Sequence, residues 1–307
     1  MINGLMSVCV VFLLLAVGFY FTKREKWPGN TNKVLSTVVV QIAAPALAIT
    51  SIENRFNPQL LMASGKNLVM ITICIFILHF IGILLAKIMK LSKKKKAVFV
   101  TTFTFNNAMF IGLPINQIVF GHDGLPYLFT YYLVIIVLFW SLGAYTLSKA
   151  SDEGGKSFSI KKIFSPGLIG VMIGCVLAAL GLTLPDILEK SLEYLGDMTV
   201  PMSLLVIGSN LSTSLKNGPV KIDISTVVIM VGKFLISPAL MYAACLIFHV
   251  TGLPMSVFIL SASLPCHAQT AIMAEYYDLE SEYASNLVSI STLICLVTIP
   301  VYAALLT

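Results

Sequence analysis

Long apolar segments separated by short polar ones dominate this chain of 307 residues. A helix needs about 20 mostly apolar residues to cross the hydrocarbon core of a bilayer. The pattern predicts an all-α polytopic membrane protein whose seventh span begins with charged turns at the membrane interface. The ten expected transmembrane helices cover residues 3–22, 31–53, 67–89, 97–120, 124–148, 166–183, 186–211, 224–248, 253–275 and 283–306.

Polar residues and helix breakers interrupt the fourth and ninth of these segments. The fourth contains "FNNAMFIGLP" (residues 105–114), and the ninth contains "SLPCHAQTAIMAEYY" (residues 263–277). Non-helical backbone at membrane depth is tolerated where protein buries it or where it lines a wet cavity. We therefore expect two broken helices that cross, although each proline taken alone is more typical of a kink in a packed helix. The residues expected to meet at the crossing are Asn106, Asn107, Cys266, His267 and Gln269.

The chain divides into two halves that resemble each other. Residues 1–148 and 166–307 each hold five expected spans, joined by a cytoplasmic linker at 149–165. An odd number of spans per half makes the repeat an inverted one. Gln41 lies four residues before Pro45, and Asp197 lies four residues before Pro201. Each proline removes the donor for the carbonyl four residues back, so both halves place a polar side chain beside a freed carbonyl.

Composition and charge support a membrane protein and indicate its orientation. Only 11% of residues are charged, against about 25% in soluble domains. The first segment has no basic leader region, so we interpret it as a retained span rather than a signal peptide. The odd-numbered connections hold sixteen Lys and Arg residues and the even-numbered ones hold three. The positive-inside rule then predicts extracellular N- and C-termini in a cell (plasma) membrane protein.

Lys233 is the basic residue that stands inside an expected span. A central lysine costs about 2.5–3.5 kcal/mol on insertion scales, so it should face the protein interior. It is either the counter-ion of an anionic substrate or a structural cation that neutralises carbonyl ends at the helix crossing. Pro238 follows it and frees the carbonyl of Phe234.

Three further polar residues are candidates for coupling transport to an ion. Asp197 either binds a coupling proton or Na⁺ or pairs with Lys190. His79 is either a proton relay or a hydrogen-bonded packing residue. Gln41 joins them because of its place before Pro45.

Several other classes of function are disfavoured by the residues. The six cysteines lie in apolar segments, which is typical of free buried thiols, and none has metal-ligand spacing. We expect no cofactor beyond coupling H⁺ or Na⁺. An intramembrane enzyme would need a nucleophile with a base or a metal set, and no such motif occurs. The "LSKKKK" run indicates orientation or contact with anionic lipid rather than nucleic-acid binding. An anion channel or a membrane sensor is the alternative to a carrier.

These features together resemble the auxin efflux carrier family of secondary transporters, which includes bacterial malate-permease-type members. "NNAMFIGLPINQIVFG" is similar to the family's Asn-x-x-x-x-Gly-x-Pro signature, here Asn107, Gly112 and Pro114. "PCHAQTAIMAEYY", from Pro265, resembles its second crossover segment. "GKFLISPALM", with Lys233, resembles its basic residue followed by proline.

The resemblance implies a fold and an activity. The fold is an inverted five-plus-five repeat shared with bile acid–sodium symporter relatives. Spans one, two, six and seven form a scaffold, and the other six form a transport domain. It also implies an elevator mechanism, a homodimer and small organic anions as substrates, either dicarboxylates such as malate or auxin-like monocarboxylates. Asn107 and the segment beginning at Pro265 would contact the substrate carboxylate. The chain departs from the plant members at Asn106, where they have proline, and in its short central loop.

Overall fold

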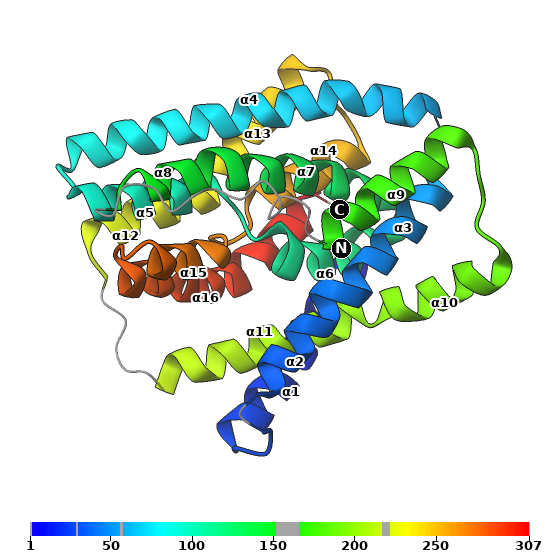
Figure 1. Cartoon of the computed structure of the whole chain (residues 1–307), viewed down its shortest axis with the longest axis horizontal. Coiled ribbons are helices and arrows are strands. Elements are labelled where there is room, and N and C mark those ends of the chain that lie inside the picture. The colour runs from blue at the N-terminus through cyan, green and yellow to red at the C-terminus, as the bar shows by residue number, and fades with distance from the viewer. Residues whose placement is uncertain (1, 29, 56–57, 152–165, 217–221, 307) are drawn as a thin grey trace.

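The computed structural model describes every residue except 1, 29, 56–57, 152–165, 217–221 and 307, so most of the linker lies outside the described part. The described residues form helices and contain no β-strand (Figure 1). Five helices are long and apolar enough to cross a membrane: Thr31–Glu53, Gly65–Ile88, His122–Ser148, Ile224–Ile247 and Ser281–Leu306. Four shorter apolar helices accompany them, at Leu13–Lys23, Ala108–Phe120, Pro166–Leu180 and Leu253–Ala262. An all-helical polytopic membrane protein is thereby confirmed.

The helices of the first half follow the predicted segments, except that α4 begins at Pro58, nine residues before the predicted start at residue 67. They are α1 (Ile2–Lys23), α2 (Thr31–Val38), the π-helical η1 (Val39–Ala43), α3 (Ala44–Arg55), α4 (Pro58–Ile88), α5 (Lys93–Thr104), the π-helical η2 (Ala108–Gly112), α6 (Leu113–Phe120), the 3₁₀ turn η3 (His122–Gly124), α7 (Leu125–Leu138), the π-helical η4 (Phe139–Gly143) and α8 (Ala144–Ser148).

The second half also consists of α-helices, with a π-helical turn among them. It contains α9 (Pro166–Leu180), α10 (Asp186–Asp197), α11 (Thr199–Lys216), α12 (Ile224–Val231), the π-helical η6 (Gly232–Ile236), α13 (Ser237–Ile247), α14 (Leu253–Ala262), α15 (Gln269–Tyr276) and α16 (Ser281–Leu306). The seventh predicted segment is divided at Met198, where α10 ends and α11 begins. Most of α10 is exposed, and it extends away from the rest of the molecule in Figure 1.

Proline explains where three of the π-helical turns form. The turns η1, η2 and η6 each end two residues before a proline, namely Pro45, Pro114 and Pro238. A proline cannot donate to the carbonyl four residues back, and its ring presses on that carbonyl. A π-turn widens the helix there and relieves the clash. The carbonyl of Phe234, which Pro238 frees, accepts a hydrogen bond from the Tyr302 hydroxyl at 2.6 Å.

Glycines allow two helices to cross closely. A Cβ atom built on Gly18 of α1 would overlap the carbonyl oxygen of Leu205, and one built on Gly208 of α11 would overlap that of Leu15. Membrane helices associate through such small residues because lipid provides no hydrophobic drive between them. The α1–α11 crossing therefore depends on the absence of side chains at both positions.

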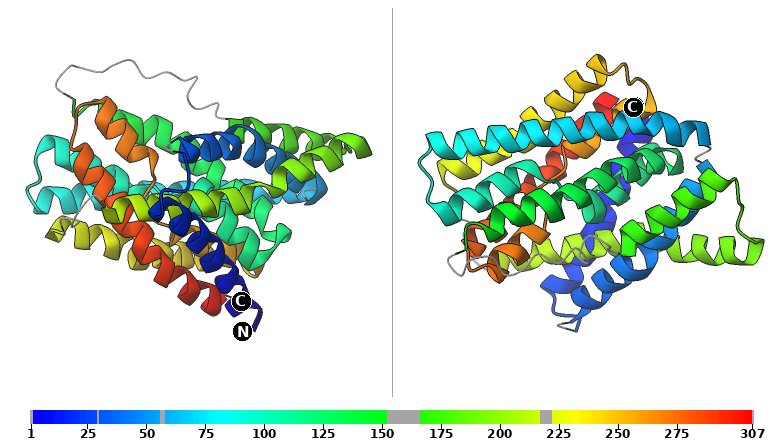
Figure 2. Two further views of the ribbon diagram at one scale, coloured as in Figure 1. Left: turned by 90° about the horizontal axis from the view of Figure 1, so that it is seen from below. Right: turned by 45° about the horizontal axis from the view of Figure 1, so that its top comes forward.

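The helices gather into two groups. α1, α2, α3, α9, α10 and α11 pack on one another, chiefly through α1 with α11 and α3 with α9 and α10. The remaining helices pack around α4, α5, α7 and α13, with α15 lying along α16 (Figure 1). The start of α1 and the end of α16 lie at the same end of the molecule in the left view of Figure 2.

Candidate functional site

The two interrupted helices meet at their breaks. The backbone leaves the helical conformation between α5 and η2 and again between α14 and α15. Asn106 and Cys266 form an isolated antiparallel bridge there. Asn107 N donates to Pro265 O at 2.9 Å, and His267 N donates to Phe105 O at 3.2 Å. Each extended segment thus satisfies backbone groups of the other, as burial away from water requires.

The side chain of Lys233 contacts the first of the two extended segments. It belongs to η6 and is fully buried. Its Nζ donates to Phe105 O at 2.7 Å and to Asn106 Oδ1 at 2.8 Å. Phe105 caps the C-terminal end of α5, where unpaired carbonyls carry partial negative charge. No carboxylate of the described residues forms an ion pair with this lysine, so its charge is balanced only by dipoles.

The side chain of Asn106 donates hydrogen bonds to the other broken helix. Its Nδ2 lies 2.9 Å from Ser261 O and 3.0 Å from Ala262 O, at the C-terminal end of α14, and 3.1 Å from the Tyr131 hydroxyl. Lys233 and Asn106 together therefore supply donors to the carbonyl ends of both interrupted helices. A buried polar network whose members are hydrogen-bonded to one another favours a single geometry.

A cavity of about 320 Å³ lies beside the crossing. Asn107 lines it together with residues from the first turns of η2 and α15. Residues of α2, α11 and α16 form the rest of its wall. Its other lining residues are Ser36, Phe110, Ile111, Val206, Ile207, Ala268, Ile272, Val288, Ser289 and Thr292. No charged side chain is among them.

Asn107 is the predicted substrate-binding residue that reaches this cavity. Its Oδ1 accepts a hydrogen bond from Phe110 N at 3.3 Å, which caps the start of η2. Its Nδ2 makes no hydrogen bond to any described residue. Asn107 therefore brings an amide with a spare donor to the wall of a mainly apolar space, next to the starts of η2 and α15.

The other predicted binding residues frame the crossing without lining the cavity. Cys266 is fully buried and donates from its backbone to Ser291 Oγ at 3.1 Å. His267 stacks on Phe139 with ring centroids 4.4 Å apart, and its Nδ1 lies 3.4 Å from Gln269 N.

Gly112 and Pro114 have packing roles at the start of α6. A Cβ atom on Gly112 would lie 2.5 Å from Leu264 Cδ1 in the other broken segment, so glycine permits the two segments to approach. Pro114 is buried in the first turn of α6, directly after the π-helical turn η2 that accommodates it.

None of the three predicted ion-coupling residues lines the cavity at the crossing. Gln41 in η1 and Asp197 at the end of α10 are exposed. His79 is buried, with Nδ1 3.2 Å from Thr104 Oγ1 and Nε2 3.4 Å from Thr146 Oγ1. It borders a different cavity. His79 therefore shares no hydrogen bond with Gln41 or Asp197, and the coupling role of all three residues stays a prediction.

Sequence reasoning missed several polar residues of the site. Ser36, Ser289 and Thr292 line the cavity, and Tyr131 and Ser291 support the crossing. The run "SNLVSISTLICLV" (residues 285–297) carries the available signal, because it places three hydroxyl residues within two turns of an apolar segment.

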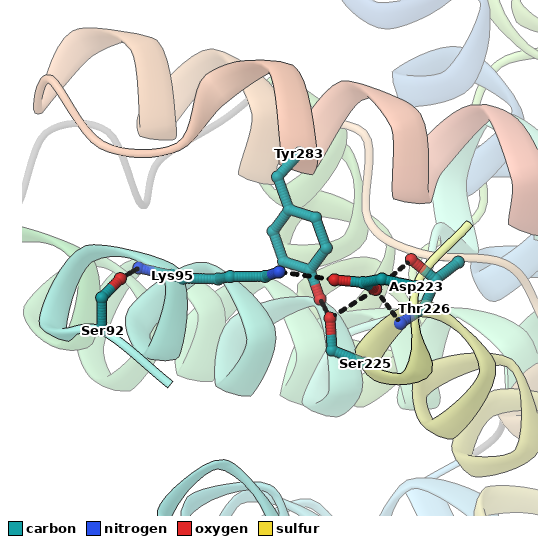
Figure 3. A network of polar contacts seen from close by, with 6 residues as sticks. All are labelled: Ser92, Lys95, Asp223, Ser225, Thr226 and Tyr283. Atoms are coloured by element: carbon teal, nitrogen blue, oxygen red, sulfur yellow. Dashed lines mark hydrogen bonds and ion pairs between the residues drawn. The ribbon is translucent and has the colours of Figure 1, made fainter. Parts of the chain in front are cut away.

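A polar network joins α5, α12 and α16 at one end of the molecule (Figure 3). Asp223 caps α12 by accepting from Thr226 N at 2.8 Å, and its Oδ2 lies 2.5 Å from Lys95 Nζ. Ser225 bridges Asp223 to the Tyr283 hydroxyl. Burial opposes ionisation of Asp223, but the hydrogen bonds from Lys95, Ser225 and Thr226 outweigh it and hold the pKa of this carboxyl below its usual range.

Comparison with known proteins gives full-length and partial relatives. An uncharacterized transporter of Methanocaldococcus jannaschii is 25% identical over 304 residues, covering 97% of both chains. An uncharacterized transporter of Methanothermobacter thermautotrophicus is 26% identical over 305 residues, covering 98% of this chain and 97% of its own. Auxin efflux carrier component 8 of Arabidopsis thaliana is 30% identical over 152 residues, which is 48% of this chain and 41% of its own.

The profile of one family matches almost the whole chain. It is described as membrane transport protein, and the match runs over residues 3–303. Members of this family are transporters and not enzymes. The chain therefore belongs to the membrane transport protein family, which is the family of the auxin efflux carriers.

Proposed function

We propose that this protein is a secondary active transporter of small organic anions. One observation carries the proposal: a cavity lies against the first turns of two interrupted helices, next to a buried lysine that has no carboxylate partner among the described residues. Helix N-termini and an uncompensated ammonium both raise the local potential. No acidic side chain lines the cavity to oppose an anion.

The lining of the cavity suits an organic anion better than an inorganic one. Its volume of about 320 Å³ is at the lower end of the range for small-molecule sites. Aliphatic and aromatic side chains of Phe110, Ile111, Val206 and Ile272 would contact a carbon skeleton. Asn107 would donate to the carboxylate. A dicarboxylate such as malate and an auxin-like monocarboxylate are the two classes this lining supports.

Lys233 acts through the crossing in this proposal. Its ammonium is bonded to Phe105 O and Asn106 Oδ1 and does not line the cavity. It therefore holds the carbonyl ends in place and contributes positive potential, while Asn107 makes the contact. Of its two expected roles, the contacts favour the structural cation.

The position of the cavity also supports an elevator mechanism. One wall comes from α2 and α11, which belong to the group built on α1, α3 and α9. The opposite wall comes from the crossing, α15 and α16, which belong to the other group. We propose that the first group is the scaffold and the second the transport domain of a ten-span inverted repeat, with halves at 1–148 and 166–307. The start of α1 and the end of α16 lie at the same end of the molecule, as an even number of spans requires.

Orientation, assembly and energy source complete the proposal. The distribution of basic residues supports extracellular termini in the cell membrane, and the family relationship supports a homodimer. An anion leaving a negative cell interior gains about 2.3 kcal/mol per charge per 100 mV. Efflux therefore needs no ion partner, whereas uptake needs H⁺ or Na⁺.

Uptake into proteoliposomes tests the proposal. Labelled malate, succinate, citrate, lactate and indole-3-acetate would each be supplied with and without imposed H⁺, Na⁺ and voltage gradients. We expect saturable uptake of at least one of them, which Asn107→Ala weakens and Asn30→Ala leaves unchanged. Asn30 is the matched control because its amide is exposed and makes no capping hydrogen bond. Uptake indifferent to Asn107→Ala would refute the site, and currents far above carrier turnover would indicate a channel.

A further inference from the structure

A second cavity, of about 480 Å³, opens between α4, α5 and α8. It shares no lining residue with the cavity at the crossing. Three lysines line it, Lys93 and Lys96 from α5 and Lys149 from the end of α8. Lys93 and Lys96 are three residues apart on a helix and so share one face.

Among the described residues, no carboxylate forms an ion pair with any of these three lysines. Lys149 Nζ lies 5.6 Å from the centroid of the Tyr145 ring, which also lines the cavity. The contrast with their neighbours is informative, because Lys94 pairs with Asp278 and Lys95 with Asp223 on the other side of α5.

The surrounding helices supply no negative charge either. Neither α4, α5 nor α8 contains an aspartate or a glutamate. Three like charges around one space repel one another, and a bound anion relieves that repulsion. The charge of the described lining therefore favours an anion as a ligand.

The walls below the lysines indicate what kind of anion fits. Ile83, Val100 and Leu142 line the cavity, and Phe80 and Leu84 continue along α4 as largely exposed apolar side chains. A cationic rim above an apolar wall suits a charged headgroup with an apolar body behind it. Lysine is a common phosphate ligand, acting as a point charge.

We propose that this cavity binds a phosphate-bearing anion, supplied either by the headgroup of an anionic phospholipid or as free phosphate. The basic loops before α5 and after α8 both fall on the side assigned to the cytoplasm by the positive-inside rule. Phospholipid headgroups and soluble phosphates both have access to that face. This inference does not depend on the identity of the transported substrate.

Titration of the purified protein in detergent tests the inference, with binding followed by native mass spectrometry. The probes are dioctanoyl phosphatidylglycerol, inorganic phosphate and, as the zwitterionic comparison, dioctanoyl phosphatidylcholine. The test variant is Lys93→Gln/Lys96→Gln/Lys149→Gln. The matched control, Lys23→Gln/Arg24→Gln/Lys26→Gln, removes three positive charges from the first basic loop and lines neither cavity.

We expect saturable binding of phosphatidylglycerol or phosphate that the test variant weakens by about 100-fold, since each lysine near an anionic surface contributes roughly a fivefold preference. The control should stay within about twofold of wild type. Dependence on the lysines for phosphatidylglycerol alone identifies a lipid site, and the same dependence for phosphate identifies a free-phosphate site. Equal losses in both variants, or no saturable binding of either anion, would overturn the proposal.

A second variant tests whether the anion enters the cavity or is only attracted by the positive charge of the lysines. Ile83→Trp adds bulk to the lining at a partly exposed position and leaves the charge unchanged. We expect it to weaken binding of the same probe at least tenfold. Binding unchanged in Ile83→Trp would show that the anion does not enter the cavity, which contradicts the proposal even if the triple variant fails to fold.

Discussion

Asn106 and Asn107 are adjacent amides with different surroundings. Asn106 is fully buried and bonded on all sides by Lys233, Tyr131 and the end of α14. Asn107 lines the cavity and accepts one bond at the start of η2. Successive side chains of an extended segment point to opposite sides. Because the backbone is extended at the break, Asn106 stabilises the fold and Asn107 lines the cavity.

Substitution of Asn106 should consequently impair mainly stability, and substitution of Asn107 should impair mainly transport. Asn106→Ala should lower the free energy of unfolding by about 3 kcal/mol, because it leaves buried carbonyls and Lys233 without partners. Asn107→Ala should lower it by about 1 kcal/mol, the cost of a lost cap, but should raise the KM for the transported anion at least tenfold. Thermal melting in detergent and uptake kinetics check the pair. Equal destabilisation by both would contradict the assignment.

Asp223 makes a pH-dependent contribution to stability. Its pKa is held below the ordinary aspartate value of about 3.9. A carboxyl with a lowered folded-state pKa stabilises the folded protein above its unfolded-state pKa and loses that effect as the pH falls toward the folded-state pKa. Asp223→Asn should therefore lower the Tm by a constant amount above about pH 5, and the difference should shrink below about pH 4.

A neighbouring ion pair provides the control for Asp223. Asp278 pairs with Lys94 at 3.3 Å, but its side chain is 96% exposed. Surface pairs of this kind contribute little to stability. Asp278→Asn should leave the Tm unchanged between pH 3 and pH 8, and a shift as large as that of Asp223→Asn would contradict the account of the network.

At the scale of helices, the α1–α11 crossing gives the sharpest prediction. Gly208→Ala places a Cβ atom onto the Leu15 carbonyl, so the helices must separate. We expect a marked loss of Tm and of monodisperse protein on size-exclusion chromatography. Gly65→Ala on α4 is the control, because nothing lies within 4 Å of its added Cβ. Since alanine favours helix over glycine by about 1 kcal/mol, that variant should be neutral or stabilising.

The helices were predictable from sequence because their signals are local. Apolar length predicted α9 and α16, and Pro45, Pro114 and Pro238 were recognised as residues that interrupt a helix. The sequence also located both breaks within the fourth and ninth segments. It did not predict that a π-turn accommodates each of these three prolines. That outcome depends on how each freed carbonyl is satisfied, as Phe234 O is by Tyr302.

The candidate site was less predictable because it depends on contacts between distant segments. Lys233 was recognised as buried, but its partners Phe105 O and Asn106 Oδ1 come from more than 120 residues away. The hydroxyls of Ser36 and Thr292 reach the cavity from helices whose register the apolar pattern does not fix. Tertiary packing, and not local composition, decides which polar side chains face a shared space.

At the scale of the whole molecule, the account requires one group of helices to move past the other. The cavity at the crossing has Ile207 of α11 on one side and Ile272 of α15 on the other. Cysteines at these two positions, in a background without the native cysteines, can be joined across the cavity by a bis-methanethiosulfonate reagent. Reduction with dithiothreitol releases the link.

The most direct measurement is uptake of the labelled organic anion by proteoliposomes that carry this double-cysteine variant, before cross-linking, after it and after reduction. The two single-cysteine variants, treated with a monofunctional reagent of similar size, control for blockage of the cavity. The account predicts saturable uptake that the link abolishes, that reduction restores, and that the single variants retain in greater part. Uptake that continues at the same rate in fully cross-linked protein would contradict both the site and the movement.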